Sequence, residues 1–387
     1  MNDAVIAGYV RTPFTFSRKG PLATVRPDDL AAITLKALVQ RADIDPRLIE
    51  DVLMGCAYPE GVQGDNIARI ASLLAGLPIE LGGATVNRFC GSSMYAIHMA
   101  AGQIAIGAGE AFIAAGVESM TLVPQGGLSF SPNPRFASPQ HPDAEIATEA
   151  YVTMGQTAEN VALKYGVTRA DQEELAYESQ QKAAAAQAAG RLKDEIVPVT
   201  TAEGVVVEHD LCLRPQTTLE GLAALKPAFG EHGTVTAGTA SPLTDGAVAV
   251  LVTSAAFAQR HGLQVLARIK SSAIAGVAPE FMGMGPVPAT QKALARAGLS
   301  IKDIDVVEIN EAFGSQAVAC LRELGIDRNR ANIDGGAIAL GHPLGATGAR
   351  ITAKAAQILH RTGGRYALAT QCIGGGQGIA TILEAVS

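Results

Sequence analysis

Apolar residues are spaced along this chain in two ways that alternate. Short continuous apolar runs are typical of buried strands, whereas apolar residues three or four positions apart are typical of helices. In the first third of the sequence, strands are expected at residues 4–10, 51–56, 83–86 and 111–117, and helices at 30–38, 67–75 and 94–101. The alternation predicts an α/β fold with a mainly parallel sheet that helices cover on both faces.

The alternation stops in the middle third of the chain. Residues 124–142 are rich in Pro, Gly, Ser and Asn, which is typical of a loop, and two helical patterns follow. Thr168 and Asp171 have the spacing of a capping box at the start of the second helix, and Gly190 stands where that helix would end. The segment indicates an inserted lobe that faces a ligand, before the alternation returns at 247–253.

An internal repeat relates the two ends of the chain. Three pairs of segments or residues match at one constant separation: 51–56 with 305–310, 112–116 with 366–370, and Gly109 with Gly363, each glycine expected to end a helix. The same separation carries Cys90 onto Leu344. We therefore expect one βαβ unit to be used twice, with the loops of both copies meeting at a shared face beyond the strand ends.

Composition narrows the class of protein. A length of 387 residues predicts two or three domains, and a net charge of −7 without a dense Lys/Arg run argues against nucleic-acid binding. The cysteines are few and widely spaced, which fits a reducing compartment and predicts no zinc site. The early apolar run leaves no room for a signal peptide, and no apolar stretch reaches the roughly 18 residues of a membrane span. A cytoplasmic protein is expected.

Cys90 is the first candidate for chemistry. It lies where the apolar run 83–86 ends and helical spacing resumes at Met94. Unpaired amides and the positive end of a helix dipole at such a corner favour thiolate over thiol, which suits a nucleophile. The alternative is a small buried cysteine beside a helix start.

Three further residues fall on the same predicted face. His342, held stiffly between a glycine and a proline, is a plausible base for a Cys–His pair, or else a structural histidine. Cys372 precedes a glycine run whose amides suit an oxyanion hole better than a nucleotide loop, or else it is a buried strand-end cysteine. Asn310 would orient a water or donate to a carbonyl, or else form a turn. Glu311 is either a surface carboxylate or a partner that orients a histidine.

Several of these stretches together resemble the signature blocks of the thiolase family. The matching blocks are residues 87–94 (NRFCGSSM), 310–313 (NEAF), 336–345, 348–350 and 372–376 (CIGGG). The resemblance runs from Arg11 to the C-terminus. Related condensing enzymes share the fold but lack the NEAF block and the second cysteine.

The resemblance implies a five-layered αβαβα fold made of two duplicated halves and an inserted, coenzyme A-binding loop domain. The implied divisions are residues 1–119 with 243–265 for the N-terminal half, 120–242 for the loop domain and 266–387 for the C-terminal half. A homodimer or homotetramer is expected.

The resemblance also implies an acyltransferase that works without a metal or redox cofactor, with coenzyme A as a substrate. Cys90 would attack a 3-ketoacyl-CoA, and His342 would take its proton and line one oxyanion hole with a water held by Asn310. Cys372 would protonate the departing acetyl-CoA enolate. The amides of Cys90 and Gly374 would form a second oxyanion hole.

By the same resemblance, five residues would bind coenzyme A. Ser241 would lie against the pantetheine, Phe229, Met282 and Phe313 would line its tunnel, and Arg214 would sit near the adenine-phosphate end. Plain core packing is the alternative for Phe229 and Met282.

One departure from the family bears on the substrate. Thiolases specialised for acetoacetyl-CoA tend to carry a histidine just before a Met-Gly pair, and here that position is Thr153. This favours the degradative type with a broader chain-length range. The alternatives are a biosynthetic acetoacetyl-CoA thiolase and a non-catalytic, thiolase-like scaffold.

Overall fold

The computed structural model of the chain describes residues 3–136 and 150–386. The N-terminal half contains β1 (Ala4–Arg11), β2 (Thr15–Phe16), α1 (Pro27–Ala42), β3 (Asp51–Gly55), α2 (Ile67–Leu74), β4 (Ala84–Val86), α3 (Ser92–Ala105), β5 (Ala111–Ser119), β8 (Thr244–Ser254) and α8 (Ala255–Arg260). The C-terminal half contains β9 (Ala267–Gly276), α9 (Pro286–Ala297), β10 (Val306–Ile309), α10 (Gly314–Leu324), α11 (Ala337–Leu340), α12 (Leu344–Thr362), β11 (Tyr366–Ile373) and β12 (Gln377–Glu384). Between β5 and β8 lie α5 (Met154–Lys164), α6 (Arg169–Ala188), β6 (Val199–Thr200), β7 (Val206–Val207) and α7 (Leu219–Ala223).

Most of the strands form one long sheet in the order β10-β11-β12-β9-β1-β8-β5-β3-β4, with β2 paired to β8, whereas β6 and β7 form a separate two-stranded sheet. The two halves of the long sheet join only where Val5 and Ile6 of β1 pair with β9. The prediction of a mainly parallel sheet is wrong, because only β3–β4, β3–β5 and β10–β11 are parallel and the remaining pairs are antiparallel. A tight turn joins β11 to β12, and such a connection leaves no room for a crossover helix, so the two strands run in opposite directions.

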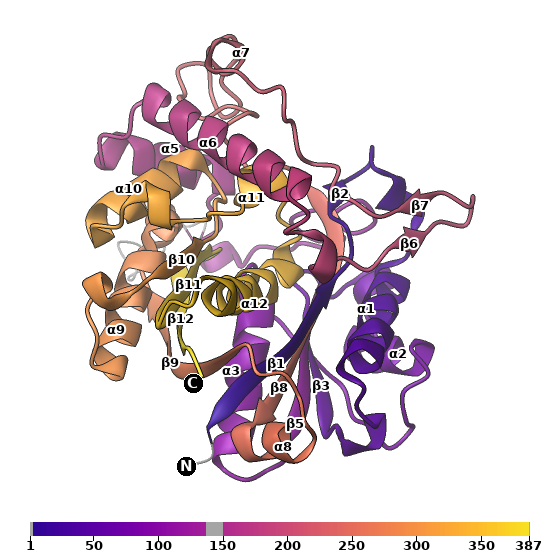
Figure 1. Cartoon of the computed structure of the whole chain (residues 1–387). Coiled ribbons are helices and arrows are strands. Elements are labelled where there is room, and N and C mark those ends of the chain that lie inside the picture. The colour runs from indigo at the N-terminus through magenta and orange to yellow at the C-terminus, as the bar shows by residue number, and fades with distance from the viewer. Residues whose placement is uncertain (1–2, 137–149, 387) are drawn as a thin grey trace.

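Three hydrophobic clusters hold five layers together, because the central one packs two helices against both halves of the sheet. This confirms the αβαβα expectation. One cluster joins α1 and α2 to β1, β3, β5 and β8, and another joins α9 and α10 to β10, β11 and β12. The third lies between the two halves of the sheet and contains α3 and α12. Figure 1 shows these two helices at the centre of the molecule, with α1 and α2 on one side and α9 and α10 on the other.

The two halves repeat one another in strand register as well as in order. Val52 of β3 pairs with Ile113 of β5, and the residues that the repeat predicts to be equivalent, Val306 and Ala367, pair in the same parallel fashion. One detail of the predicted repeat is wrong. Gly363 does follow α12 with a left-handed backbone, but α3 already ends at Ala105, so Gly109 does not end it.

The middle segment forms a lobe above the layered halves in Figure 1, with α5 and α6 as its main helices. The predicted capping box is confirmed, since the Thr168 hydroxyl accepts from the Asp171 amide and the Asp171 carboxylate accepts from the Thr168 amide. Gly190 is left-handed just after α6, as predicted. The part of the predicted 124–142 loop beyond residue 136 lies outside the described residues, and the boundaries of the lobe at 120 and 242 stay a prediction.

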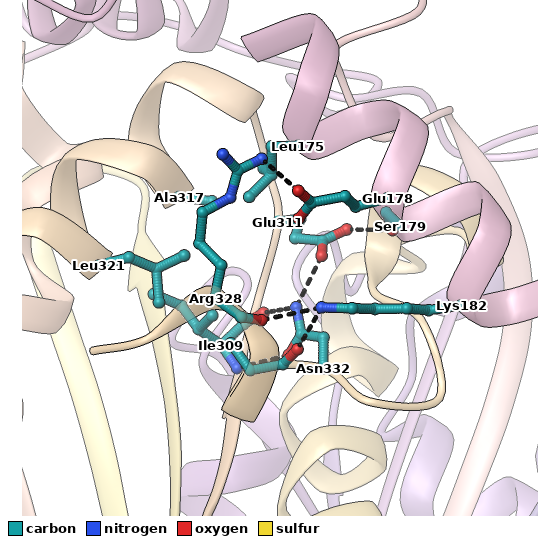
Figure 2. A pocket seen from close by; sticks show the side chains of 11 residues that line it. Leu175, Glu178, Ser179, Lys182, Ile309, Glu311, Ala317, Leu321, Arg328 and Asn332 are labelled. Atoms are coloured by element: carbon teal, nitrogen blue, oxygen red, sulfur yellow. Dashed lines mark hydrogen bonds and ion pairs between the residues drawn. The ribbon is translucent and has the colours of Figure 1, made fainter. Parts of the chain in front are cut away.

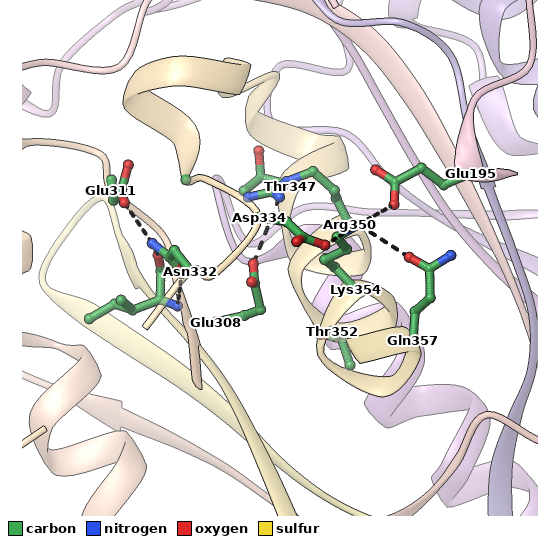
Figure 3. A network of polar contacts seen from close by, with 12 residues as sticks. Glu195, Glu308, Glu311, Asn332, Asp334, Thr347, Arg350, Thr352, Lys354 and Gln357 are labelled. Carbon is green, nitrogen blue, oxygen red and sulfur yellow. Dashed lines mark hydrogen bonds and ion pairs between the residues drawn. The ribbon is translucent and has the colours of Figure 1, made fainter. Parts of the chain in front are cut away.

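Buried ion pairs connect the lobe to both halves of the sheet. Glu195 of the lobe accepts from Arg11 of β1 and from Lys354 of α12, each at 2.8 Å. Asp334 in turn lies 3.1 Å from Lys354, as Figure 3 shows. These partners are almost fully buried, so the pairs hold the lobe in a defined position relative to α12. Across the described residues, no helix is both long and apolar enough to cross a membrane.

Candidate active site

Cys90 occupies a strained corner between β4 and α3. Phe89, directly before it, has a left-handed backbone with φ of +43°, a conformation that costs energy in a residue with a bulky side chain. The hydroxyl of Ser92 stabilises this bend, because it donates to the Phe89 carbonyl and accepts from the Arg88 amide at 2.9 Å. The corner turns Cys90 out of the sheet and leaves it partly exposed.

The C-terminal half of the chain holds this corner in place. The side-chain amide of Gln371, next to Cys372, donates to the Cys90 carbonyl. A side chain at Gly91 would lie 2.5 Å from Ile373, so only glycine allows the two segments to come this close. The first thiol and the strand end that carries the second are therefore neighbours, as the repeat predicted.

The Cys90 sulfur faces two backbone amides but is not acidic. The packed protein around it raises the pKa of Cys90 to about 11, although hydrogen bonds from the amides of Gly374 and of Cys90 itself act in the opposite direction. The nearby carboxylate of Glu118 raises the pKa further. The expectation that the helix start would make Cys90 a thiolate is therefore wrong, because loss of solvent outweighs the amide dipoles.

His342 is held in a rigid, buried turn. Its amide donates to the Thr244 hydroxyl at 3.0 Å, and the preceding Gly341 has a φ of +103°, which a side chain would strain. On the side of the ring facing α12, the Nδ1 atom lies 2.6 Å from the hydroxyl of Thr347. Burial and the Arg350 charge lower the pKa of His342 to about 3. The imidazole is neutral at ordinary pH.

The contacts of Thr347 determine which ring nitrogen of His342 carries the hydrogen. The hydroxyl of Thr347 donates its one hydrogen to the Pro343 carbonyl at 3.0 Å, so it can only accept from the Nδ1–H of His342. The Nε2 atom then carries the electron pair, which accepts from the side-chain amide of Asn310 at 3.3 Å. A neutral histidine in this tautomer is equipped to accept a proton at Nε2.

The parallel pairing of β10 and β11 sets the relative positions of Asn310 and Cys372. The Asn310 amide donates to the Thr370 carbonyl at 3.0 Å, which places the side chains of Asn310 and Cys372 at the same ends of adjacent strands. The side-chain oxygen of Asn310 is buried without a hydrogen-bond partner. Burial, together with the Cys90 charge, raises the pKa of the Cys372 thiol well above its ordinary value. Both thiols are therefore protonated at neutral pH.

Cys90 contacts a small cluster that includes the first residue of α12. Leu344, two residues after His342, packs with Ala57 and Met120, and Cys90 lies against this small cluster. The buried Arg350, whose charge acts on His342, lies 3.8 Å from Glu308 of β10. Figure 3 labels both side chains. Burial raises the pKa of Glu308 to about 8 against the lowering effect of the Arg350 charge.

Glu311 is neither a surface carboxylate nor a histidine partner, so both predictions for it are wrong. Figure 2 shows it beside a small cavity between α6 and the end of β10. It is buried and accepts from Ser179 at 2.6 Å, from Asn332 at 2.7 Å and from the Ile338 amide at 3.2 Å. Its carboxylate fastens the segment before His342 to α6, because strand β10 ends too deep in the molecule for its side chain to reach solvent.

Four of the five residues expected to bind coenzyme A lie near Cys372. Met282 and Phe313 share a hydrophobic cluster with Cys372, and the ring of Phe229 stacks edge-on against Phe313 at 5.9 Å. Ser241 joins the same wall through hydrogen bonds to the Ala312 carbonyl at 3.0 Å. The Phe229 side chain is 39% exposed, so the alternative of plain core packing does not hold for it.

Arg214 lies against other elements. Its backbone amide donates to Gln180 of α6 at 2.8 Å, and its guanidinium points to the Ile338 carbonyl at 3.5 Å. The group is half-buried, and burial lowers the pKa of Arg214. Its contacts are with α6 and α11 rather than with the wall formed by Phe229 and Phe313.

Sequence reasoning did not identify three residues that touch this site: Thr347, Gln371 and Glu118. Thr347 lies between two of the family's signature blocks, and a hydroxyl five residues after His342 was the available signal. Glu118 and Gln371 each lie just beyond the segments expected as strands, 111–117 and 366–370, so the pattern gave them no role. Their contacts are with distant segments, so no local signal could identify them.

Comparisons with known proteins agree with this geometry. The chain matches the family model described as the thiolase N-terminal domain over residues 4–256 and the one described as the thiolase C-terminal domain over residues 263–385. It is 46% identical over 396 residues to a Bacillus subtilis (strain 168) protein named 3-ketoacyl-CoA thiolase, covering 99% of this chain and 100% of that protein. A Shewanella denitrificans protein of the same name is 47% identical over 396 residues, with 100% of both chains covered. An Escherichia coli (strain K12) protein named 3-oxoadipyl-CoA/3-oxo-5,6-dehydrosuberyl-CoA thiolase is 48% identical over 406 residues, again with 100% of both chains covered.

Proposed function

The chain belongs to the thiolase family, and on that premise we propose that it cleaves 3-ketoacyl-CoA with coenzyme A through an acyl-Cys90 intermediate. One observation supports this most directly. The Cys90 sulfur faces the Gly374 amide and lies near Cys372, and Cys90 contacts the cluster of Leu344, two residues after the His342 that pairs with Asn310. Two thiols, one base and a pair of amides are the groups that a ping-pong acyl transfer between thiols requires.

The first step joins Cys90 to the keto carbon of the substrate. His342 removes the Cys90 proton at Nε2, and the sulfur attacks the carbonyl carbon. Because the pKa of Cys90 is about 11, the attack needs this base at neutral pH. The new Nε2–H then donates to the oxyanion, with Asn310 holding a water as the second donor.

Collapse of this adduct breaks the bond between the α and β carbons. The acyl group stays on Cys90 as a thioester, and the electron pair leaves on the enolate of acetyl-CoA. Cys372, protonated beforehand because burial raises its pKa, gives its proton to the enolate carbon. Transfer of one proton from the His342 imidazolium to the Cys372 thiolate returns both groups to neutral.

The second half-reaction releases the acyl group. The thiol of a free coenzyme A molecule gives its proton to the neutral His342 and attacks the Cys90 thioester. The Cys90 thiolate leaves and takes that proton back, which regenerates the Cys90 thiol and forms a shortened acyl-CoA. The amides of Cys90 and Gly374 stabilise the oxyanion of this step. The reverse sequence is a Claisen condensation by the same groups.

Coenzyme A reaches this site along the wall that Phe229, Met282, Phe313 and Ser241 form. Phe229 lies directly over Gly155, where a side chain would come within 2.1 Å of its ring. The glycine thus lets the aromatic ring lie close to Phe313 and to Met154, whose sulfur approaches Gly374. Arg214, which contacts α6 and α11, is assigned to the adenine-phosphate end by the resemblance to the family.

We assign the degradative role of fatty-acid β-oxidation over acetoacetyl-CoA synthesis. Thr153 supports this, because thiolases specialised for acetoacetyl-CoA tend to carry a histidine at that position. In the structure the Thr153 hydroxyl accepts from the Gln156 amide as the N-cap of α5. Relatives named for 3-ketoacyl-CoA and for 3-oxoadipyl-CoA are similarly close to this chain. Rates on acetoacetyl-CoA, a long 3-ketoacyl-CoA and 3-oxoadipyl-CoA separate the three substrate classes.

The remaining parts of the proposal concern the state of the protein. It works without a metal or redox cofactor, as a cytoplasmic homodimer or homotetramer. Activity that survives extensive dialysis against a chelator tests the first point. Light scattering of the purified protein, together with cell fractionation, tests the others.

Trapping the acyl group tests the reaction itself. Incubation with 3-ketoacyl-CoA in the absence of free coenzyme A leaves an acyl adduct on Cys90, which peptide mass spectrometry locates. Cys90→Ala forms no adduct. A Cys90→Ala variant that still becomes acylated, or a wild-type protein without thiolysis activity, contradicts the proposal and favours a non-catalytic scaffold.

A further inference from the structure

Glu118, the last residue but one of β5, is a fully buried carboxylate with four N–H donors. One oxygen accepts from the amides of Ala57 and Gly345, each at 2.8 Å. The other accepts from the Gln63 side chain at 2.9 Å and from the Tyr58 amide at 3.2 Å. All four N–H groups donate, and the Cys56 thiol lies 3.8 Å from the same carboxylate. Burial raises the pKa of Glu118, and these hydrogen bonds act in the opposite direction by favouring the ionised form.

The donors come from both halves of the molecule. Ala57 and Tyr58 follow β3, which pairs with the strand leading to Cys90, whereas Gly345 lies in the first turn of α12, three residues after His342. A carboxylate at this end of a helix satisfies an otherwise unpaired amide and complements the helix dipole. Glu118 therefore caps the helix of the histidine from within the half that carries the nucleophile.

The backbone of the first turn of α12 contacts the backbone at the ends of β3 and β5 directly, because the residues at the contact are glycines. A side chain at Gly345 would lie 2.6 Å from the Val117 carbonyl, and one at Gly116 would lie 2.3 Å from the Gly345 carbonyl. The first turn of α12 thus rests directly on the ends of β3 and β5. Any change in the length of the side chain at position 118 moves this turn relative to the strand ends.

We infer that Glu118 is a positioning residue that sets the geometry between Cys90 and His342 by tying the start of α12 to the ends of β3 and β5. This inference rests on the roles proposed above for Cys90 and His342. Glu118 touches neither the substrate nor the reacting atoms, and it acts through the turn that begins at His342.

The charge of Glu118 has a second consequence. This charge raises the pKa of the Cys90 thiol, whereas hydrogen bonds from the amides of Gly374 and Cys90 lower it. The other titratable groups at this point are the thiols of Cys56 and Cys372 and the hydroxyl of Tyr58, which are uncharged at neutral pH because burial raises the pKa of each. Loss of the Glu118 charge should therefore make Cys90 more acidic.

A double-mutant cycle tests the inference. The rate of Cys90 alkylation by iodoacetamide at pH 7, read by peptide mass spectrometry, is measured for wild type, Glu118→Asp, His342→Ala and the double variant. Glu118→Asp keeps the charge but is too short to reach both halves. We expect it to slow alkylation about tenfold alone, and to have no further effect once His342 is absent.

The pH dependence of the Cys90 alkylation rate in Glu118→Gln is a second test, because loss of a purely structural contact would not shift it. The steep rise of alkylation with pH shifts to lower pH in Glu118→Gln and stays in place in Glu118→Asp. Glu311→Gln is the matched control, because it removes another buried carboxylate held by neutral donors, and it leaves the rise where it is in wild type.

The outcomes separate this inference from the roles on which it rests. Additive effects in the cycle, or an unmoved rise in a folded Glu118→Gln, overturn the inference. If His342→Ala itself alkylates at the wild-type rate at pH 7, the proposed base is wrong. Should Glu118→Gln fail to fold, the cycle with Glu118→Asp decides alone.

Discussion

The Nδ1 atom of His342 lies 2.6 Å from the hydroxyl of Thr347, and that hydroxyl gives its only hydrogen to the Pro343 carbonyl. The pair therefore holds the imidazole with its hydrogen on Nδ1 and its basic electron pair on Nε2. Asn310, on the other side of the ring, donates to that electron pair at 3.3 Å. The orientation of the proposed base is determined by a residue within its own helix start.

Thr347→Val should slow acylation of Cys90. Valine has nearly the shape of threonine but cannot accept from Nδ1–H, so the buried hydrogen loses its partner and the other tautomer becomes accessible. We expect the single-turnover acylation rate to fall on the order of 10²-fold with KM little changed, as general-base catalysis contributes at least this much. Thr347→Ser is the control and should keep most of the rate. Wild-type acylation by the valine variant would contradict the assigned tautomer.

The pH dependence of Cys90 alkylation follows from two shifted pKa values. Burial lowers the pKa of His342 to about 3, so the imidazole stays uncharged over the whole ordinary pH range. The pKa of Cys90 is raised to about 11, so the thiolate fraction rises until about that pH. Wild type should show a pH-independent rate near neutrality from base-assisted attack, followed by a tenfold rise per pH unit. His342→Ala should show the rise alone, and a plateau near pH 8.5 in either protein would argue against a buried thiol.

Cys372→Ala should divide the reaction into its two parts. Cys90 keeps its base and its amides, so the variant should still be acylated by acyl-CoA. It lacks the thiol that exchanges protons with the α carbon, so deuterium exchange from solvent into acetyl-CoA should be lost. Nuclear magnetic resonance of acetyl-CoA in deuterated buffer measures the exchange. Exchange at the wild-type rate would remove Cys372 from its proposed role.

Gly336→Ala should destabilise the segment that precedes His342. The added carbon would lie 2.0 Å from the carboxyl carbon of Glu311, which three hydrogen bonds hold in place. We expect a loss of about 2 kcal/mol in the free energy of unfolding, typical of overpacking. Gly102→Ala is the control. It lies within α3 with no atom near the new carbon, so it should be neutral or stabilising by up to about 1 kcal/mol. Equal effects of both changes in urea denaturation would contradict the crowding at Gly336.

The ion pairs of Asp334 should make stability depend on acid pH. Burial alone would raise its pKa, but the hydrogen bond from Arg361 and the charges of Lys354 and Arg191 lower the pKa to about 2. A carboxyl group whose pKa is lower in the folded than in the unfolded chain stabilises the fold at pH values above the unfolded-state pKa, which is near 4. This stabilisation is lost as the pH falls towards 2. Asp334→Asn should cost about 3 kcal/mol at pH 7 and progressively less below pH 4, measured by urea denaturation. If the stability difference between wild type and Asp334→Asn did not shrink in acid, the ion pairs of Asp334 would not be its cause.

The local parts of the fold were predictable because their causes are local. The corner at Cys90 follows from an apolar run that changes to helical spacing, and the capping box follows from Thr168 and Asp171 in sequence. The parallel sheet was mispredicted because strand direction depends on how the chain returns. Strand β12 follows β11 after a short turn, and β8 returns from the lobe to pair antiparallel with β5.

The sequence by itself determined which side chains are available and which family the chain resembles, because the signature blocks and the repeat are properties of residue order. Only the tertiary structure decided their protonation states and their partners. Cys90 is a protonated thiol and His342 a neutral imidazole because packing against distant segments raises the pKa of the first and lowers that of the second. Glu118 links their two halves because β3, β5 and α12 meet there. Burial and electrostatic energies depend on the distances between segments, and those distances exist only in the folded chain.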